Sequence, residues 1–214
     1  MERDIAAIRK DYVQHELSKS QVNANPVEQF RLWLNEALKS EVNEPTAMTV
    51  STVSSQGIPS SRILLLKDVK PDGFVFYTNY QSHKAKELES NPSVALNFFW
   101  PELERQVRIQ GSAEKISKAE SEAYFQSRPK NSQIGAWASP QSSVISNREI
   151  LEEREKTLHE KFQHQEVLPK PEQWGGYIVR PFLIEFWQGR ASRLHDRIVY
   201  TLDNQQWKTY RLAP

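Results

Sequence analysis

The 214-residue sequence predicts an α+β fold, mainly β with helices, in which antiparallel strands form a closed or partly closed barrel. Two observations predict it. At least six short segments have the alternation or the β-branched and aromatic content of strands. Turn-forming residues separate them, as in the Pro-Asp-Gly of residues 71–73 and the Asp-Asn of residues 203–204. We expect a single domain over residues 1–214.

Two helices are expected before the first strand. Residues 3–19 are polar and predict the first one. The second is expected to begin after Asn25 as N-cap, with Pro26 in its first turn. Its apolar residues recur at helical spacing, at positions 30, 33, 34 and 38. Pro45 ends this region.

The remaining chain predicts strands interrupted by helices. The expected strands are residues 47–53, 61–67, 74–78, 94–100, 105–115, 177–187, 193–202 and 207–212. The expected helices are residues 83–90, 118–127, 131–138 and 147–164. The glycine pair within residues 174–176 is expected to break the pattern before the last three strands.

The composition argues against several functional classes. The net charge is +1, so bulk charge points neither to nucleic acid nor to a membrane surface. The longest aliphatic run, residues 63–66, is far too short to span a membrane, and the first twelve residues do not resemble a signal peptide. The chain has no cysteine, which excludes disulfides, thiol nucleophiles and iron–sulfur clusters. A cytoplasmic protein is expected.

Glycine-based phosphate sites and metal sites are not expected either. The seven glycines form neither a dinucleotide-binding nor a Walker A pattern, so side chains must bind any phosphate. His159 and His164 are five residues apart and would lie on different sides of a helix, which does not suit a metal. No G-x-S-x-G occurs. Redox chemistry on a bound cofactor is the most coherent remaining class.

The C-terminal part contains the densest group of charges. In the expected strand over residues 193–202, Arg193, His195 and Arg197 would point the same way and form a cationic wall. Such a wall suits a small phosphorylated ligand, and His195 could titrate near neutral pH. A solvated edge strand with alternating charges is the alternative.

Two earlier segments also contain cations near strand ends. Arg62 and Lys67 flank an apolar strand and, being five residues apart, would face opposite sides of a sheet. Tyr77, Thr78 and Lys84 lie where a strand runs into a helix N-terminus, which is a common phosphate site. Charges flanking a core strand and an ordinary capping turn are the alternatives.

Further along the chain, Tyr124, Arg128 and Ser132 would lie around a corner between two helices and could hold a phosphate ester. The amide of Gln106 suits the edge of a heteroaromatic ring, and a polar loop follows at Gln141. A surface arginine and linker residues are the alternatives.

Together and in this order, these segments resemble the pyridoxamine/pyridoxine 5′-phosphate oxidase family. The resemblance covers nearly the whole chain, through residues 62–67, 77–79, 82–84, 104–108, 124–129, 132–137, 141–143, 185–189, 193–197 and 211–214. It implies an FMN-binding split β-barrel. It also implies a homodimer that holds FMN at the subunit interface, a phosphorylated pyridine substrate, and O2 as acceptor.

The resemblance implies a role for individual residues. Arg62 and Lys84 would bind the FMN phosphate. The full FMN-binding set would be Arg62, Ile63, Leu64, Leu65, Leu66, Lys67, Tyr77, Thr78, His83, Lys84, Gln106, Gln141, Ser142, Trp187 and Arg197. The substrate phosphate would be held by Lys67, Tyr124, Arg128 and Ser132.

The same resemblance assigns the two ends of the chain to the substrate. Arg193 and His195 would face the pyridine ring as the catalytic residues, with residues 171–214 completing the active site. Arg9 and Tyr12 would belong to a helical segment, residues 1–20, that closes over the substrate.

One position departs from the family pattern. The family commonly has an arginine before the lysine in residues 82–84, and this chain has His83. A histidine carries less charge than an arginine near neutral pH and cannot clamp a phosphate through two nitrogens. Weaker FMN retention is expected, with affinity falling as pH rises.

The implied reaction is oxidation of pyridoxamine or pyridoxine 5′-phosphate to pyridoxal 5′-phosphate, with hydride transfer from C4′ to the flavin and release of H2O2. Two alternatives stay open. One is a different flavin oxidoreductase on the same barrel. The other is a flavin or pyridoxal-phosphate carrier without turnover.

Overall fold

The computed structural model describes residues 4, 5 and 11–214. Within them, nine strands form one antiparallel sheet in the order β2-β1-β5-β6-β7-β4-β3, with β8 on β7 and β9 on β8. The strands are β1 (Ala47–Val53), β2 (Pro59–Leu65), β3 (Asp68–Lys70), β4 (Gly73–Asn79), β5 (Ser93–Trp100), β6 (Arg105–Lys115), β7 (Trp174–Gln188), β8 (Asp196–Asp203) and β9 (Gln206–Leu212).

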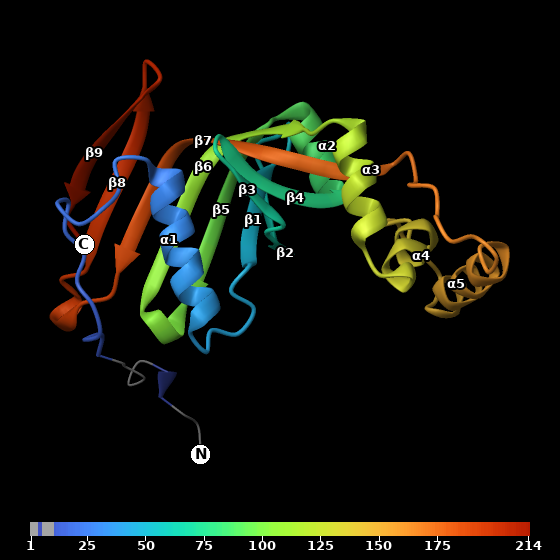
Figure 1. The fold of residues 1–214 in the computed structure, drawn as a ribbon, viewed down its shortest axis with the longest axis horizontal. Coiled ribbons are helices and arrows are strands. Elements are labelled where there is room, and N and C mark those ends of the chain that lie inside the picture. The colour runs from blue at the N-terminus through green and yellow to red at the C-terminus, as the bar shows by residue number, and fades with distance from the viewer. Residues whose placement is uncertain (1–3, 6–10) are drawn as a thin grey trace.

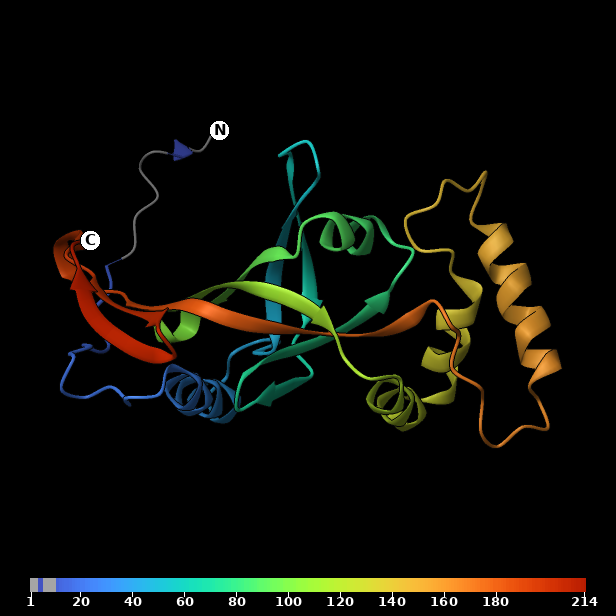
Figure 2. The same ribbon diagram turned by 90° about the horizontal axis from the view of Figure 1, so that it is seen from above.

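Strand β7 connects the two ends of the molecule. Its first part, Trp174–Val179, pairs with β4, and its last part, Leu183–Gln188, pairs with β8. Strand β6 runs along its other edge. In both views, β8 and β9 therefore lie at one end of the long β6–β7 ribbon, and the helices α4 and α5 lie at the other (Figures 1 and 2).

Five α-helices accompany the sheet in the part of the chain that the structure describes. They are α1 (Pro26–Lys39), α2 (His83–Ser90), α3 (Lys118–Ser127), α4 (Lys130–Ala138) and α5 (Glu149–Lys161). As expected, Asn25 caps α1, because its side-chain oxygen accepts a hydrogen bond from the Val27 amide at 2.8 Å. No described helix is both long and apolar enough to cross a membrane.

The main core lies between α1 and the sheet. Phe30 of α1 is fully buried, and its ring lies 4.9 Å, centroid to centroid, from both Phe74 and Phe98. Each such ring buries a large apolar area and stabilises the fold by several kcal/mol (about 3–5 kcal/mol for truncation to alanine). A second, smaller cluster fastens the helical end to the start of β7 and contains Phe125, Ile134, Phe162, Leu168 and Trp174.

Most of the expected strands and helices are confirmed, although strand β3 was not expected and β2 ends two residues early, at Leu65. Three other differences are larger. The glycine pair does not break the pattern but lies inside β7. A Cβ atom on Gly175 would come within 2.2 Å of the Tyr80 hydroxyl, and one on Gly176 within 2.8 Å of the Tyr77 ring. Here glycine marks the close approach of side chains from the neighbouring strand, rather than a strand end.

The second difference is at residues 193–195, where a strand was expected. Strand β8 begins only at Asp196, and residues 191–193 form a 3₁₀ turn in which Ser192 and Arg193 have φ angles of 57° and 61°. The prediction that Arg193, His195 and Arg197 form the wall of one strand is therefore wrong. A strand pattern read from side-chain alternation alone cannot detect a left-handed backbone.

The third difference is at the N-terminus. Residues 11–17 are not helical, and the predicted helical segment is wrong over this described part. The backbone amides of Gln14 and Leu17 instead donate to the carboxylates of Glu104 (3.1 Å) and Asp196 (3.0 Å), so side chains of the barrel replace helical hydrogen bonds. Arg9 and the other residues of positions 6–10 lie outside the described residues.

Candidate active site

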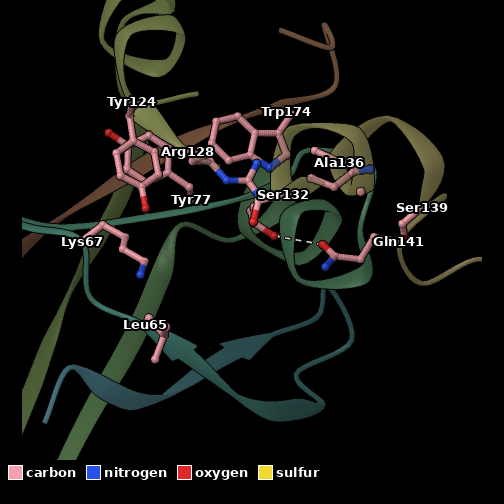
Figure 3. Close-up of a pocket in the computed structure, with 13 residues that line it drawn as sticks. Leu65, Lys67, Tyr77, Tyr124, Arg128, Ser132, Ala136, Ser139, Gln141 and Trp174 are labelled. Atoms are coloured by element: carbon pink, nitrogen blue, oxygen red, sulfur yellow. Dashed lines mark hydrogen bonds between the residues drawn. The ribbon is translucent and has the colours of Figure 1, made fainter. Parts of the chain in front are cut away.

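A pocket of about 440 Å³ lies where the ends of β2 and β4 meet the corner between α3 and α4. It is called the aromatic pocket below. Its lining residues are Leu65, Lys67, Tyr77, Thr78, Asn79, Tyr124, Arg128, Ser132, Gly135, Ala136, Ser139, Gln141 and Trp174 (Figure 3). The four residues expected to hold a substrate phosphate, Lys67, Tyr124, Arg128 and Ser132, all belong to this lining.

One wall of the aromatic pocket is a stack of rings. Tyr77 lies 3.8 Å from Tyr124 and 5.3 Å from Trp174, centroid to centroid, with nearly parallel planes. Burial, and then the neighbouring Tyr124, raises the pKa of Tyr77 to about 12. Burial also raises the pKa of Tyr124. Both phenols therefore keep their protons at neutral pH and can donate hydrogen bonds.

Arg128 lies over this wall with spare donors. Its Cζ atom is 4.8 Å from the centroid of the Trp174 ring, a distance typical of cation–π contacts. Its Nη1 atom is buried and has no hydrogen-bond partner among the described residues. Burial lowers the pKa of Arg128 from its very high ordinary value. A buried donor without a partner is costly, and an anion in the pocket would satisfy it.

Lys67 lies across the pocket from Arg128, in the link between β2 and β3, where its amide donates to the Val75 carbonyl at 2.8 Å. The expected alternation of Arg62 and Lys67 on one strand is wrong, because β2 ends at Leu65. The Lys67 side chain is exposed and makes no hydrogen bond or ion pair within residues 4, 5 and 11–214.

Next to the aromatic pocket lies a group that we call the cationic seat, made of Arg62, Thr78, Ser82, Lys84 and Gln141. Lys84 is only 6% exposed, and its Nζ atom lies 3.0 Å from Thr78 Oγ1, 3.3 Å from Ser82 Oγ and 3.2 Å from Gln141 Oε1. Burial, and then the charge of Arg62, lowers the pKa of Lys84 to about 8.

The partners of Lys84 are all neutral oxygens, and no carboxylate contacts it in the part of the chain that the structure describes. Ser82, the N-cap of α2, makes no side-chain cap bond, so the first amides of the helix also remain available. A buried ammonium and a helix N-terminus together suit a phosphate.

Arg62 is held on the other side of the seat. Its Nη1 atom donates to Thr52 Oγ1 and its Nη2 atom to Ser60 Oγ, both at 2.6 Å. Glu87 of α2 lies against the same hydroxyls and is 3.5 Å from Arg62 Nη2. The sequence analysis missed Thr52, Ser60 and Glu87. The only available signal was the spacing of Glu87, one turn after His83 and Lys84.

The other residues expected to contact FMN near the cationic seat are exposed, half-buried or part of the core. His83 is 67% exposed on its side chain, and its Nδ1 atom lies 3.6 Å from Glu87 Oε1. Ser142 is exposed, in a loop where its φ angle is 70°. In β2, Leu64 and Leu65 are half-buried, and Ile63 is exposed. Leu66, just after the strand, belongs to the core.

The remaining expected residues form a separate group at the other end of β7. This C-terminal cluster consists of Tyr12, Gln106, Trp187, Arg193, His195 and Arg197. The Trp187 ring lies 4.6 Å from the His195 ring and 5.8 Å from the Tyr12 ring. Gln106 is paired in register with Trp187. The Tyr12 ring also lies 5.9 Å from the His195 ring, so the structure places Tyr12 beside His195.

The two arginines and the histidine of the C-terminal cluster differ in their hydrogen-bond and ion-pair partners. Arg197 is clamped on buried Glu185 by two bonds of 3.0 Å, Nε to Oε1 and Nη2 to Oε2. His195 Nδ1 accepts the Arg190 amide at 3.1 Å, and burial, followed by Arg193, lowers the pKa of the His195 ring. Arg193 is exposed, and its side chain has no hydrogen-bond or ion-pair partner among the residues placed by the structure.

Comparison with known families matches residues 34–161 to the family described as pyridoxamine 5′-phosphate oxidase. Residues 174–214 match the pyridoxine 5′-phosphate oxidase C-terminal dimerisation region. Two curated relatives are called pyridoxine/pyridoxamine 5′-phosphate oxidase. One, from Trichormus variabilis, is 53% identical over 100% of both chains. The other, from Actinobacillus succinogenes, is 55% identical over 97% of this chain and 98% of its own.

Two solved structures share the fold. PhzG from Burkholderia lata, in complex with tetrahydrophenazine-1-carboxylic acid, has a TM-score of 0.89 and 28% identity over 94% of this chain and 99% of its own. A pyridoxamine 5′-phosphate oxidase-related, FMN-binding protein from Nostoc punctiforme has a TM-score of 0.68 and 17% identity, over 94% and 100%. The sheet is therefore a split β-barrel, as expected.

Proposed function

The chain belongs to the pyridoxamine 5′-phosphate oxidase family, and from this premise we propose that it oxidises pyridoxamine and pyridoxine 5′-phosphate to pyridoxal 5′-phosphate with bound FMN. The observation that carries the proposal is the aromatic pocket, where a buried donor of Arg128 lacks a partner beside Lys67, Tyr124 and Ser132. A phosphorylated ring satisfies both the donors and the aromatic wall.

The residues present fit FMN. The cationic seat supplies two cations, the hydroxyls of Thr78 and Ser82, and the free amides of α2, which is a donor set suited to a phosphate monoester. When bound, FMN would supply the acceptor for the hydride that leaves C4′, with O2 as the final acceptor that forms H2O2. The second proton leaves the nitrogen or oxygen on C4′, and for the amine substrate water then hydrolyses the C=N bond to give the aldehyde and NH3.

The side chains of this protein bind and orient the substrate. Lys67, Arg128 and the two hydroxyls would hold its phosphate, which fixes the position of the ring. Arg193 has no side-chain partner among the described residues, so its donors can bind the uncharged amine or the hydroxyl at C4′. A guanidinium has donors and no acceptor, which suits it to orient the substrate. His195 Nδ1 already accepts a hydrogen bond, so the neutral ring carries its proton on Nε2 and acts as a donor that orients the substrate.

A homodimer is part of the proposal because one chain cannot complete the site. Trp174 of the aromatic pocket and Trp187 of the C-terminal cluster are at opposite ends of β7, roughly 40 Å apart at the rise of an extended strand. One flavin cannot touch both groups in a single chain. The match to a dimerisation region supports a partner subunit that supplies the second group.

An anaerobic titration tests this function. The protein is reconstituted with FMN, pyridoxamine 5′-phosphate is added, and the flavin absorbance is followed. We expect bleaching that air reverses. A bound flavin that does not bleach would contradict the proposed reaction and favour a carrier or another oxidoreductase of this fold, such as one acting on a non-phosphorylated ring as the PhzG complex suggests.

A further inference from the structure

Helix α2 carries two oppositely charged side chains one turn apart, and they face different neighbours. Lys84 faces the neutral oxygens of the cationic seat. Glu87, only 5% exposed, faces strands β1 and β2, where it accepts hydrogen bonds from Thr52 and, at 2.7 Å, from Ser60. Neither the catalytic proposal nor the lining of the aromatic pocket uses Glu87.

Glu87 and Arg62 share the same two hydroxyls. Ser60 Oγ lies 2.6 Å from Arg62 Nη2 and 2.7 Å from Glu87 Oε2, and Thr52 lies between the same two groups. The carboxylate itself is 3.5 Å from the guanidinium. Among residues 4, 5 and 11–214, it is the only carboxylate that contacts a cation of the seat.

The charges explain why a carboxylate is placed there. Arg62 and Lys84 are close enough to repel each other, and part of the lowered pKa of Lys84 comes from Arg62. Burial opposes the ionisation of Glu87, but hydrogen bonds from Thr52 and Ser60, with His83 and Arg62 nearby, outweigh it and keep its pKa below the usual range. With Glu87 ionised, the three charges sum to +1.

A bound phosphate monoester brings about −1.5 to −2 charges at pH 7 and compensates the same two cations. Glu87 and a phosphate therefore have the same electrostatic role at the seat, and they repel each other. Because two buried cations without an anion are costly, removing Glu87 penalises the free protein more than the complex.

We propose that Glu87 is a resident counter-anion of the cationic seat, which holds Arg62 in place in the free protein and lowers the affinity of the seat for the FMN phosphate. This inference rests on the proposed function, since it assumes that the seat binds FMN. The proposal predicts that loss of Glu87 strengthens FMN binding. A purely structural role predicts the opposite, because loss of Glu87 would then disorder the seat and weaken FMN binding.

The test compares FMN with riboflavin, which lacks the phosphate. Dissociation constants of both flavins are measured by flavin fluorescence for the apoprotein of the wild type and of Glu87→Gln. We expect FMN to bind about tenfold more tightly to Glu87→Gln, the size of effect of one partly screened charge close to a phosphate. Riboflavin should bind equally to both proteins.

Two further variants act as controls. Glu89→Gln makes the same charge change on an exposed residue of the same helix and should leave both constants unchanged. Glu87→Asp keeps the charge and should keep the FMN affinity within about threefold of the wild type, since charge rather than side-chain length sets the effect. An Asp variant that binds like the Gln variant would overturn the proposal.

The outcomes separate this inference from the proposed function. If the wild type binds FMN no better than riboflavin, the seat is not a phosphate site and both proposals fall. If the wild type prefers FMN but Glu87→Gln binds it equally or more weakly, only the role of Glu87 is overturned. Should apo Glu87→Gln unfold, release of FMN from protein purified with FMN gives the same comparison. Slower release supports the proposal, and equal or faster release overturns it.

Discussion

Both ends of the β6–β7 ribbon carry cationic side chains, but these side chains have different partners at the two ends. At the helical end, Arg128 has a buried nitrogen without a partner, and Lys84 contacts only neutral oxygens. At the other end, Arg197 is clamped on Glu185, and Arg211 pairs with Asp196. Arg128 and Lys84 are poised for a ligand, whereas Arg197 and Arg211 hold the chain together. Arg62 combines both features, because it belongs to the cationic seat and lies 3.5 Å from Glu87. Arg193 is the exception at its end, since its side chain has no partner within the described residues.

Replacing Arg128 should give the largest effect. Arg128→Ala removes two or more charge-assisted hydrogen bonds to the substrate phosphate, so kcat/KM for pyridoxamine 5′-phosphate should fall by about 10²–10³-fold. Thermal stability should hold or rise, because a buried unpaired donor is removed. Steady-state kinetics and a melting curve check both. Arg148→Ala, at an exposed ion pair, is the control. A clear fall in the melting temperature of Arg128→Ala, together with the loss of activity, would contradict the view that Arg128 serves the ligand rather than the fold.

Arg197 should show the opposite behaviour. Arg197→Ala leaves the Glu185 carboxylate buried with only Arg108, 3.4 Å away, and should lower the free energy of unfolding of the apoprotein by about 3 kcal/mol. Urea unfolding measures it. The double change Arg197→Met with Glu185→Leu should recover most of the loss. If Arg197→Ala leaves the free energy of unfolding of the apoprotein unchanged but lowers its flavin affinity, Arg197 belongs with the ligand-binding cations instead.

The pH dependence of FMN binding should reflect the protonation of Lys84. Its pKa is about 8 because of burial and then Arg62, and a bound phosphate favours the charged ammonium. The contribution of Lys84 to the affinity should therefore be complete well below pH 8 and should be lost above it, by up to about tenfold per pH unit, as the free protein loses this proton. Fluorescence titrations between pH 7 and 9.5 measure the slope. The slope should be absent in Lys84→Gln, and a slope that persists there would exclude Lys84 as its source.

The N-terminal strap, residues 11–17, extends the contrast to a segment whose backbone amides are bound by the carboxylates of Glu104 and Asp196 and whose Leu17 side chain is buried in the core. Asp196 accepts the Leu17 amide at 3.0 Å and also pairs with Arg190 at 3.5 Å. Asp196→Asn should loosen Tyr12 over His195 and raise the substrate KM by about three- to tenfold, the loss of roughly one charged hydrogen bond, with little change in kcat. Glu16→Gln, an exposed partner of Arg190, is the control. A change confined to kcat would contradict this role.

His83 should give the smallest effect. Its exposed side chain lies 3.6 Å from Glu87, and within the described residues no hydrogen bond or ion pair joins this side chain to the cationic seat. His83→Arg introduces a guanidinium, which can bind a phosphate through two nitrogens, and should tighten FMN binding about two- to fivefold. Calorimetric titration across pH 6–8.5 measures it. No change at any pH would contradict the expectation drawn from the family pattern.

The sequence predicted most of the fold because its strands alternate and its turns carry proline, glycine and asparagine. Helix α1 follows from Asn25, Pro26 and the helical spacing of its apolar residues. The left-handed turn at Ser192 and Arg193 was missed, since neither residue type signals a positive φ. Residues 11–17 were predicted as helix because their true partners, Glu104 and Asp196, are distant in sequence.

The site shows the same limit. The corner from Tyr124 to Ser132 was predicted from local spacing, and it lines one pocket in the structure. Glu87 was missed because its contacts with Ser60 and Arg62 exist only after α2 packs across β1 and β2. The sequence also gave no indication that the residues assigned to one flavin lie at opposite ends of β7. Distances between segments arise from tertiary packing, which periodicity does not report.

The length of β7 has a genetic consequence. If each active site combines the helical end of one subunit with the C-terminal cluster of the other, then Arg128→Ala and Arg193→Ala disable different halves. Co-refolding the two inactive proteins in equal amounts should make half of the dimers hybrids, each with one intact site and one doubly defective site. About one quarter of all sites would then regain activity, so two damaged alleles could complement each other within a single cell.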